Sequence, residues 1–423
     1  MPRIANTCPV DLVVAASDSR RKADSDYICT GTNDEVTINL ALAAASAAGG
    51  RVILRRGTYS ALHQVFGQIL GAGGAGDPHE RSALAITGSN VTLECEPGAL
   101  LSLANTQRCS GLLVIGDGLV NVRIIGFQWN GNRANNATGY TTDHTLHAGI
   151  KVIRSLANIN QDVAVEHCRL TGCQDLGVFV YAVNTLVSHC RVDDTAVDGI
   201  EIADGPGTVR DCVLRYTQTG ESGITLAASH GVVEACVLET LTGGSLTVSG
   251  ISSNNGAQYS LIKGNRLVGD GSGTFIYNSC KALSISDIGA IIEGNTLLGQ
   301  NWGQMNIDLP KGRSRFFNNF VTYGVVTVNN TGADRTEIVG NQFIAAPSGG
   351  NATVIFLLRG RASVIGNTLN NRAVGVLVDA GNLEAKGCLV KRNTWETGLT
   401  TPITDNSGAN GPVVAADNDT AGA

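Results

Sequence analysis

The fold is decided by residues 165–214, which read VEHCRLTGCQDLGVFVYAVNTLVSHCRVDDTAVDGIEIADGPGTVRDCVL. This stretch contains three copies of one short pattern: VEHCRL at 165–170, VSHCRV at 187–192 and VRDCVL at 209–214. Each copy begins with Val, carries Cys at its fourth position and ends on an apolar residue. A motif that returns at a regular interval is typical of a solenoid, in which each coil of the chain packs only against its neighbours.

The same pattern continues toward the C-terminus, with Asn in place of Cys at the marker position. Consecutive markers lie 22 to 30 residues apart, and loop insertions account for the variation. One marker per coil predicts a solenoid of about a dozen coils. The markers are Cys168, Cys190, Cys212, Cys236, Asn265, Asn295, Asn319, Asn341, Asn367 and Asn393.

A second set of short motifs, each opened by glycine, alternates with the markers. Period-2 alternation places their Ile and Val side chains inward and the residue between them outward. Two strand motifs within one repeat exclude a helical repeat, and a propeller blade is about twice as long. The sequence therefore predicts an all-β fold, a right-handed parallel β-helix. The motifs are Gly149-Ile-Lys-Val, Gly177-Val-Phe-Val, Gly199-Ile-Glu-Ile, Gly223-Ile-Thr-Leu and Gly250-Ile-Ser-Ser.

The marker residues have a physical role in such a coil. Asn tolerates left-handed backbone angles, and its side chain can bond its own backbone. Stacked Asn side chains can also bond one another between coils, as in other ladders that run across strands. Cys takes the same position in the first half of the chain, where we expect an apolar ladder of buried free thiols.

The N-terminal part of the chain differs from the repeats. The spacing of Thr32 and Glu35 matches a capping box, which predicts a helix over residues 33–48. The pair Gly49-Gly50 is expected to end this helix. A helix laid over the first coil would cover the unpaired strand edge and the apolar end of the stack.

Charge excludes several classes of partner. The 423-residue chain has a formal net charge of -6, so it has no bulk attraction to nucleic acid or to an anionic membrane. Short basic clusters exist, among them Arg20-Arg21-Lys22 and Arg55-Arg56, and we interpret them as solvated surface. We therefore expect no nucleic-acid partner.

The N-terminus and the cysteines indicate how the chain is made. Asp11 and Asp18 interrupt the apolar residues near the start of the chain, so we expect neither a signal peptide nor insertion into a membrane. The 11 cysteines include no CxxC motif, and several fall inside apolar strand patterns. A disulfide framework is therefore not expected.

Three segments outside the repeats are similar to the pectate-lyase-like β-helix superfamily. They read TNDEVTINLALAAASAAGGRVILRRGTY (32–59), NVTLECEPGALL (90–101) and NVRIIGFQWNGNRAN (121–135). This cap helix and first strand resemble the start of many bacteriophage tailspikes and bacterial polysaccharide-degrading enzymes, and residues 13–39 look particularly phage-like. The resemblance covers roughly residues 13–395. It implies the fold, whereas the superfamily includes lyases, hydrolases, epimerases and binding proteins.

The resemblance and the repeats divide the chain into four parts. Residues 1–31 form an N-terminal segment suited to virion attachment, and residues 32–60 hold the cap helix and the first strand. Residues 61–395 form the β-helix. Residues 396–423 are rich in Gly, Ala, Asn, Asp and Thr, and we expect a flexible tail or a segment at a trimer contact.

Candidate sites in a β-helix are columns of side chains, because outward residues on neighbouring coils lie about 4.8 Å apart. Paired carboxylates in one column suit retaining or inverting glycoside hydrolysis. The alternative is that turn Asp residues bond their own backbone. The predicted catalytic residues are Asp175, Asp198, Glu201 and Glu221. The predicted substrate-binding residues are His147, Lys151, Phe179 and Asp194, and further aromatics that could stack on sugars are Trp129, Tyr140, Tyr181, Tyr277, Trp302 and Tyr323.

Elimination is the alternative chemistry. A lyase neutralises a uronate carboxylate, often with Ca²⁺ or Arg, and removes a proton with a base, for which His147 and Lys151 are the candidates. Acid-rich surroundings favour hydrolysis, although Ca²⁺ held by the Asp cluster would reverse that preference. We otherwise expect no metal and no cofactor. The segment 77–82, DPHERS, resembles the DPH-type segment of alginate epimerases, but no matching Asp and His follow, and we interpret it as a loop turn.

Three functions remain open. The first is a bacteriophage tailspike or receptor-binding protein that binds, and in one version depolymerises, a bacterial surface polysaccharide. It would be a homotrimer located in the virion, in contact with other tail proteins. The second is a free polysaccharide hydrolase or lyase, which the missing signal peptide disfavours. The third is a structural or decorating virion protein without catalysis.

Overall fold

The computed structural model divides the chain into two compact units, residues 1–213 and residues 214–423. The structure describes residues 9–68, 79–136, 147–154, 157–216, 222–240, 249–253, 258–268, 281–285, 288–298, 305–309, 313–322, 324–329, 334–344, 353–370, 374–379, 387–395, 401–407 and 414–420.

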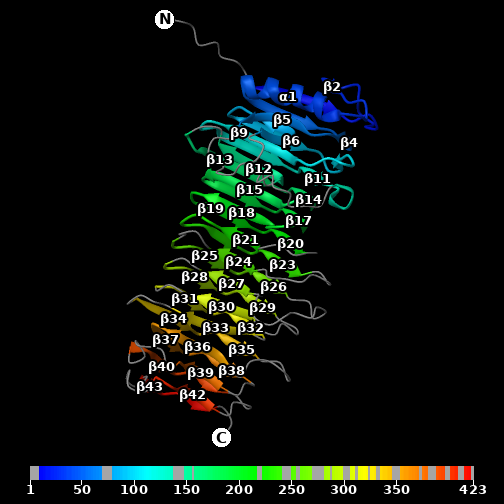
Figure 1. Cartoon of the computed structure of the whole chain (residues 1–423). Coiled ribbons are helices and arrows are strands. Elements are labelled where there is room, and N and C mark those ends of the chain that lie inside the picture. Colours follow the sequence, from blue (N-terminus) through cyan, green and yellow to red (C-terminus); the bar gives the residue numbers. More distant parts are fainter. Residues whose placement is uncertain are drawn as a thin grey trace, which may run out of the picture. The chain divides into compact units, whose positions relative to one another are not determined.

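The first unit consists of short strands in three sheets, with one helix at its N-terminal end (Figure 1). Sheet A contains β1 (Val10–Ala15), β2 (Tyr27–Ile28), β3 (Gly50–Leu54), β7 (Val91–Cys95), β10 (Val120–Ile125), β13 (Asn160–Glu166), β16 (Thr185–Ser188) and β19 (Gly207–Arg210). Sheet B contains β4 (Gly57–Ala61), β8 (Ala99–Leu103), β11 (Gln128–Asn130), β14 (Arg169–Cys173) and β17 (Arg191–Thr195), and the 3₁₀ turn η1 (Arg133–Asn135) follows β11. Sheet C contains β5 (Gln64–Gln68), β6 (His79–Ile86), β9 (Ser110–Gly116), β12 (Ala148–Arg154), β15 (Leu176–Val183) and β18 (Ile200–Asp204).

The second unit also consists of short strands in three sheets, and β20 (Val213–Tyr216) spans the residues at which the chain divides. Sheet A contains β22 (Val232–Glu234), β25 (Leu261–Lys263), β28 (Ile291–Glu293), β31 (Arg315–Phe317), β34 (Arg335–Val339), β37 (Arg361–Ile365), β40 (Leu389–Lys391) and β43 (Val414–Ala416). Sheet B contains β23 (Val237–Thr240), β26 (Arg266–Val268), β29 (Thr296–Leu298), β32 (Phe320–Thr322), β35 (Gln342–Ile344), β38 (Thr368–Asn370), β41 (Thr394–Trp395) and β44 (Asp419–Thr420). Sheet C contains β21 (Ser222–Leu226), β24 (Ser249–Ser253), β27 (Lys281–Ile285), β30 (Met305–Leu309), β33 (Gly324–Asn329), β36 (Thr353–Arg359), β39 (Val374–Val378) and β42 (Thr401–Asp405).

Both units are parallel β-helices, as the repeats predicted. Among the described pairings, only the hairpin of β5 and β6 is antiparallel. The coils continue past residue 395, because β42, β43 and β44 pair in parallel with β39, β40 and β41. In the part of the chain that the structure describes, no helix is long and apolar enough to cross a membrane.

Apolar side chains stack in columns inside each coil. One column in sheet A of the first unit runs through strands that pair residue by residue, and all of its side chains are fully buried. Each such side chain contributes about 1.5–3 kcal/mol by leaving water. A slip of one residue in any strand would turn its part of the column to solvent, so the apolar pattern fixes the register. The column consists of Leu93, Ile124, Val165, Val187 and Val209.

The helix α1 (Asp34–Ala48) covers the N-terminal end of the first unit, as predicted (Figure 1). The predicted capping box is wrong. Asn33 precedes the helix with a φ of 53° and makes no capping bond through its side chain. Glu35 does not reach back to Thr32. Its buried carboxylate instead accepts a hydrogen bond from the amide of Leu62 at 3.1 Å, which ties the helix to the chain after β4.

The inner face of α1 is attached to sheet C by both apolar and polar contacts. Ile38 and Leu42 are fully buried. Asn39 donates a hydrogen bond to the carbonyl of Ala83 at 2.9 Å and accepts one from the amide of Ala85 at 3.0 Å. Because these main-chain groups belong to β6, the helix satisfies backbone groups that face the end of the stack.

In the second unit the predicted asparagine ladder is confirmed. Asn319 donates from its backbone N–H and from Nδ2 to Oδ1 of Asn341, at 2.9 and 3.0 Å. Its Nδ2 also donates to two carbonyls, of Ile292 on the preceding coil and of Phe317 two residues earlier, both at 3.0 Å. Asn–Asn bonds of the same kind connect Asn265, Asn295, Asn319, Asn341, Asn367, Asn393 and Asn418.

Cysteine takes the same position in the first unit, as predicted. Cys190 Sγ lies 3.5 Å from the carbonyl of Val165 on the preceding coil and 3.2 Å from that of Ser188 two residues earlier. Cys168 and Cys212 repeat this arrangement. The thiol therefore donates weakly to the carbonyls at the positions that Nδ2 reaches in the asparagine coils.

The left-handed backbone angle falls one residue before the marker, which corrects the prediction that the marker itself adopts it. These residues connect sheet A to sheet B in every repeat. Glycine adopts the angle without strain, and Asn, Asp and His tolerate it better than most other residues. In the first unit they are His167, His189 and Asp211, and in the second unit they include Gly264, Gly294, Asn318, Gly340, Gly366, Arg392 and Asp417.

Asn319→Ala should lower the free energy of unfolding by about 3 kcal/mol. The change leaves the buried amide of Asn295 and the carbonyl of Ile292 without their partner. Denaturant unfolding followed by circular dichroism measures the effect. The matched control is Asn370→Ala, because the half-buried Asn370 side chain bonds no other described residue. Equal unfolding midpoints for the two variants would contradict the role of the ladder.

Candidate functional site

The predicted column of outward side chains lies on sheet C of the first unit. Strand pairing places Leu113, Lys151, Phe179 and Glu201 opposite one another on β9, β12, β15 and β18. Neighbouring members are therefore about 4.8 Å apart along the backbone. Leu113 is fully buried and Lys151 is only 5% exposed, whereas Phe179 and Glu201 are partly exposed. The accessible part of the column is thus the Phe179 ring and the Glu201 carboxylate, and Lys151 is buried beside them.

An apolar ridge supports Phe179 on this outer face. The ring packs against a cluster that contains Ile115 and Ile153 on the preceding coils. It also touches Leu176 and Val197, which belong to a second cluster. Packing on both sides holds the ring in place while part of it stays exposed.

Tyr181 extends the aromatic surface along β15. It lies two residues after Phe179, so the two side chains point to the same face, about 7 Å apart. The Arg154 guanidinium lies over the Tyr181 ring, with Cζ 4.9 Å from the ring centre. Tyr181 is partly exposed. The face therefore offers two fixed aromatic rings and cationic groups, which suits the apolar and polar faces of a sugar chain.

Glycines position the strands that carry this column. A Cβ atom at Gly149 would lie 3.0 Å from Cys173 Sγ, and one at Gly177 would lie 2.4 Å from Cγ1 of Val192. Because Cys173 and Val192 project from sheet B, only glycine lets sheet C approach so closely. This explains why both strand motifs open with glycine.

His147 and Asp175 lie at the starts of β12 and β15 and are joined. Asp175 Oδ2 accepts a hydrogen bond from the backbone N–H of His147 at 2.7 Å. The amide of Leu176 donates to the carbonyl of His147 at 3.0 Å. Both side chains are almost fully buried. The Asp175 carboxylate thus bonds the backbone of the preceding coil rather than its own.

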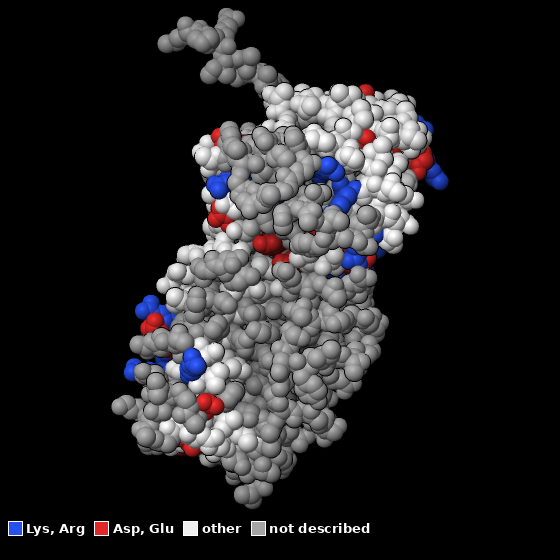
Figure 2. Space-filling model, viewed as in Figure 1, with Lys and Arg blue, Asp and Glu red and all other residues white. Residues whose placement is uncertain are grey.

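Cations that the sequence did not reveal act on His147 in addition to the neighbouring Asp175 carboxylate. Burial, followed by the charges of Lys151, Arg108 and Arg81, lowers the pKa of His147 to about 3. Burial also raises the pKa of Asp175, although the His147 amide, Arg108 and Lys151 oppose that shift. His147 is therefore neutral near pH 7. Figure 2 shows basic and acidic side chains in small separate groups over the first unit.

Of the remaining predicted carboxylates, Asp198 lies close to Asp175 along the backbone. The carbonyl of Asp175 accepts from the amide of Val197 at 2.8 Å, and the carbonyl of Asp198 accepts from Gly177 at 3.1 Å. Asp198 is therefore offset from Asp175 by one residue, as predicted, and is almost fully buried. Glu201 follows three residues later. Glu221 lies outside the described residues.

Asp194 belongs to a different sheet. It lies on β17 of sheet B, where its carboxylate forms an ion pair with the buried Arg133 of η1. Its neighbour Asp193 pairs with Arg191 at 2.6 Å. The structure thus places Asp194 away from the Lys151 column.

The described acidic side chains do not fit a Ca²⁺ site. The Asp175, Asp193 and Asp194 carboxylates already bond protein groups. Within the described ranges no three His, Cys, Asp or Glu residues are grouped as metal ligands. Because Ca²⁺ requires six to eight oxygen ligands, these carboxylates are poorly suited to hold it.

The sequence missed Arg81 and Arg108. Extending the register of β6, β9 and β12 places Arg81 level with His147. Arg108 directly precedes Cys109, which lies at the same level just before β9. The marker motifs begin at residue 165 and the glycine-opened motifs at Gly149, so the earlier coils that carry Arg81 and Arg108 could not be aligned with the later ones from the sequence alone.

Trp129 was predicted as a sugar-stacking residue, and the structure corrects this. The ring is buried inside the coil and stacks on Phe127, with the ring centres 6.4 Å apart. Four other aromatic candidates lie outside the described residues: Tyr140, Tyr277, Trp302 and Tyr323.

Comparisons with known proteins support the fold. No protein-family model matches the sequence, and no curated protein matches it. The A-module of mannuronan C-5 epimerase AlgE6 from Azotobacter vinelandii is similar in structure, with a TM-score of 0.54, 16% identity, and coverage of 93% of this chain and 98% of that one. A tailspike variant of the E. coli bacteriophage HK620, solved with a hexasaccharide, has a TM-score of 0.54 and 13% identity, and the match covers 96% of this chain and 78% of that one. PfbA, a surface adhesin of Streptococcus pneumoniae, has a TM-score of 0.52 and 13% identity, and the match covers 93% of this chain and 89% of that one. At these identities the comparisons show the fold alone, which is the parallel β-helix.

The stability of the protein should fall as the pH drops from about 7 to about 4, partly because of His147. The pKa of His147 lies near 3 in the folded chain and near 6.5 in the unfolded chain. The unfolded chain therefore binds more protons between these values, and stability is lost as the pH falls. Asp175, with its raised pKa, contributes in the opposite sense.

His147→Gln should flatten this dependence. The measurement is the unfolding temperature at several pH values for the wild type and the variant. His189→Gln, at an exposed turn of the same unit, makes the same chemical change without removing a buried ring. An unchanged slope in His147→Gln would refute the assignment of a buried neutral imidazole.

Proposed function

We propose that the first unit binds a bacterial surface polysaccharide on the outer face of sheet C, and that the chain serves as a tailspike-like receptor-binding protein. The single observation that carries this proposal is the in-register column of Lys151, Phe179 and Glu201. A sugar ring can pack its apolar face on Phe179. Its hydroxyl groups can then bond the partly exposed Glu201 on the next coil.

The cations near His147 favour an acidic polysaccharide. Arg81, Arg108 and Lys151 act together on His147, and Arg108 and Lys151 also act on Asp175. Lys151 also belongs to the aromatic column, so a glycan on this face lies close to the cations. A uronate or another acidic sugar would gain charge-assisted hydrogen bonds there.

We further propose that, if the glycan is cleaved, hydrolysis is the reaction. Burial raises the pKa of Asp175, which is what a general acid of a glycosidase requires. Asp198 lies on the next coil, offset by one residue, and the two backbones are about 6 Å apart. Elimination is less favoured, because a pKa near 3 makes His147 a weak base.

The tailspike proposal includes a homotrimer in the virion, in contact with other tail proteins. The outer face of α1 supports such a contact, because Val36 and Leu40 are 50% and 59% exposed. Ala43, Ala44 and Ala47 continue this apolar face. Light scattering on the intact chain should give three times the mass of the 43.8 kDa monomer. A monomer at all concentrations would contradict the trimer.

Phe179→Ala should weaken binding of an acidic polysaccharide at least about tenfold, because it removes the ring on which the sugar packs. A panel of acidic and neutral bacterial polysaccharides, tested by glycan array and titration calorimetry, measures this. Phe317→Ala is the matched control, since Phe317 is a partly exposed ring of the second unit. Equal losses in both variants, or no binding across the panel, would overturn the proposed function.

The same panel tests cleavage. Hydrolysis should release new reducing ends without the ultraviolet absorbance of an unsaturated sugar, and Asp175→Asn should abolish the release. Retained glycan binding by Asp175→Asn would show that the variant is folded. Absorbance from unsaturated ends would instead assign elimination, and an Asp175→Asn variant with full activity would exclude Asp175 as the acid.

A further inference from the structure

A pocket in the first unit brings together two basic clusters that lie far apart in the sequence. It is formed by the connection between β1 and β2, the turn between β3 and β4, and the turn between β7 and β8. It lies near the cap helix, on coils that precede the Lys151 column. Its lining includes Asp18, Arg20, Arg21, Arg56, Glu96 and Gly98.

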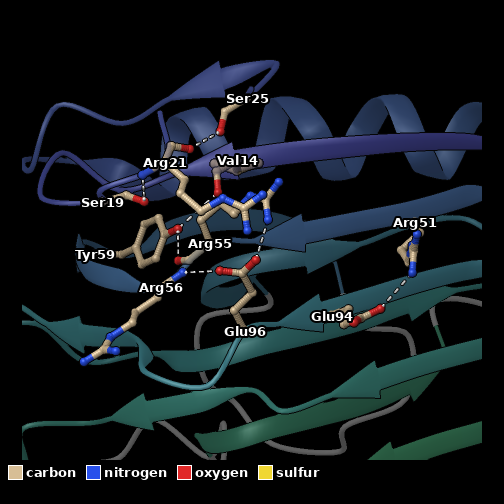
Figure 3. Close-up of polar contacts among 10 residues, drawn as sticks. All are labelled: Val14, Ser19, Arg21, Ser25, Arg51, Arg55, Arg56, Tyr59, Glu94 and Glu96. Carbon is tan, nitrogen blue, oxygen red and sulfur yellow. Dashed lines mark hydrogen bonds and ion pairs between the residues drawn. The ribbon is translucent and has the colours of Figure 1, made fainter. Parts of the chain in front are cut away.

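The two acidic side chains of this pocket are already bonded to the protein. Asp18 Oδ1 accepts a hydrogen bond from the amide of Thr58 at 2.9 Å. Glu96 accepts one from Arg55 Nη1 at 2.5 Å and one from the amide of Arg56 at 3.0 Å (Figure 3). Burial acts to raise the pKa of Glu96, but these two bonds and the charges of Arg55 and Arg21 outweigh it and lower the pKa. Glu96 therefore stays ionised and is neutralised mainly by Arg55.

Among the described residues, the three arginines that line the pocket have no such partner. No described carboxylate forms an ion pair with the guanidinium group of Arg20, Arg21 or Arg56. The Arg56 side chain extends away from Glu96 (Figure 3). It lies across Gly98, where an added Cβ would be 3.3 Å from Arg56 Cγ and Nε. The glycine therefore leaves space for Arg56 at the pocket.

The charge balance identifies the class of ligand. The three guanidinium groups outnumber the Asp18 carboxylate, whose charge is not cancelled by its bond to a neutral amide, so the pocket lining is positive. The chain as a whole nevertheless carries a net charge of -6. Arginine binds the oxygens of carboxylate and phosphate groups through paired hydrogen bonds. One carboxylate would neutralise one guanidinium, whereas a phosphate group with close to two negative charges would neutralise two and still bond the third. We propose that this pocket is a binding site for a phosphate group, separate from the proposed glycan face.

The phosphate can come from two sources with the same chemistry: free inorganic phosphate, or a phosphate ester carried by a bacterial surface polysaccharide. Titration calorimetry of the intact chain with inorganic phosphate, at constant ionic strength, tests the first. The second uses a phosphorylated polysaccharide and the same polymer after enzymatic dephosphorylation. Saturable binding of inorganic phosphate or of the phosphorylated polysaccharide supports the proposal and identifies the source. The dephosphorylated polymer should not bind at this site.

The double variant Arg21→Gln/Arg56→Gln should weaken phosphate binding at least about tenfold, because it removes charge-assisted hydrogen bonds. Arg123→Gln is the control, since Arg123 is an exposed arginine of the same unit that pairs with Glu166. An unchanged unfolding temperature verifies that the double variant is folded, and Arg20→Gln alone provides a milder second test. Phosphate binding that persists in the double variant, or no binding of either phosphate source by the wild type, would overturn the proposal. Loss of polysaccharide binding in Phe179→Ala does not bear on this site, so the two proposals fail independently.

Discussion

The rest of the structure depends on the turn that leads from sheet A to sheet B. One residue of this turn is left-handed, and the buried residue after it bonds main-chain carbonyls of its own coil and of the preceding coil. Asn319 does this through Nδ2, and Cys190 through its thiol. Because buried main-chain groups must be paired, this one side chain per coil fixes the spacing and register of the coils. Loops elsewhere in the coil can then vary in length without disturbing the stack.

A fixed register places outward side chains from successive coils opposite one another, so that they form a column. Lys151, Phe179 and Glu201 come from three coils, yet strand pairing places them opposite one another. A shift of one residue in β15 would turn Phe179 inward and its apolar neighbours outward. The binding face is therefore a consequence of the same constraint that builds the core. The buried hydrogen bond from the His147 amide to the Asp175 carboxylate also helps to hold the register, because it joins the starts of two adjacent strands.

The sequence was sufficient for the fold and for much of the column, since both follow from period and alternation. It placed Phe179 outward and offset Asp198 from Asp175 correctly, because these positions depend on register alone. It could not reveal the cations around His147, since Arg81 lies on a coil without a repeat motif. It also misplaced Trp129, whose burial depends on contacts between sheets rather than on local pattern. The left-handed residue was assigned one position too late, because Asn suits both roles.

The most direct test of the account is hydrogen–deuterium exchange of the intact chain with and without a bound acidic polysaccharide. Peptides that contain β12, β15 and β18 should exchange more slowly in the presence of the glycan, because ligand contacts suppress local opening. Peptides from sheet A of the first unit should be unaffected. Protection confined to the second unit, or to sheet A, would contradict a glycan site on the outer face of sheet C.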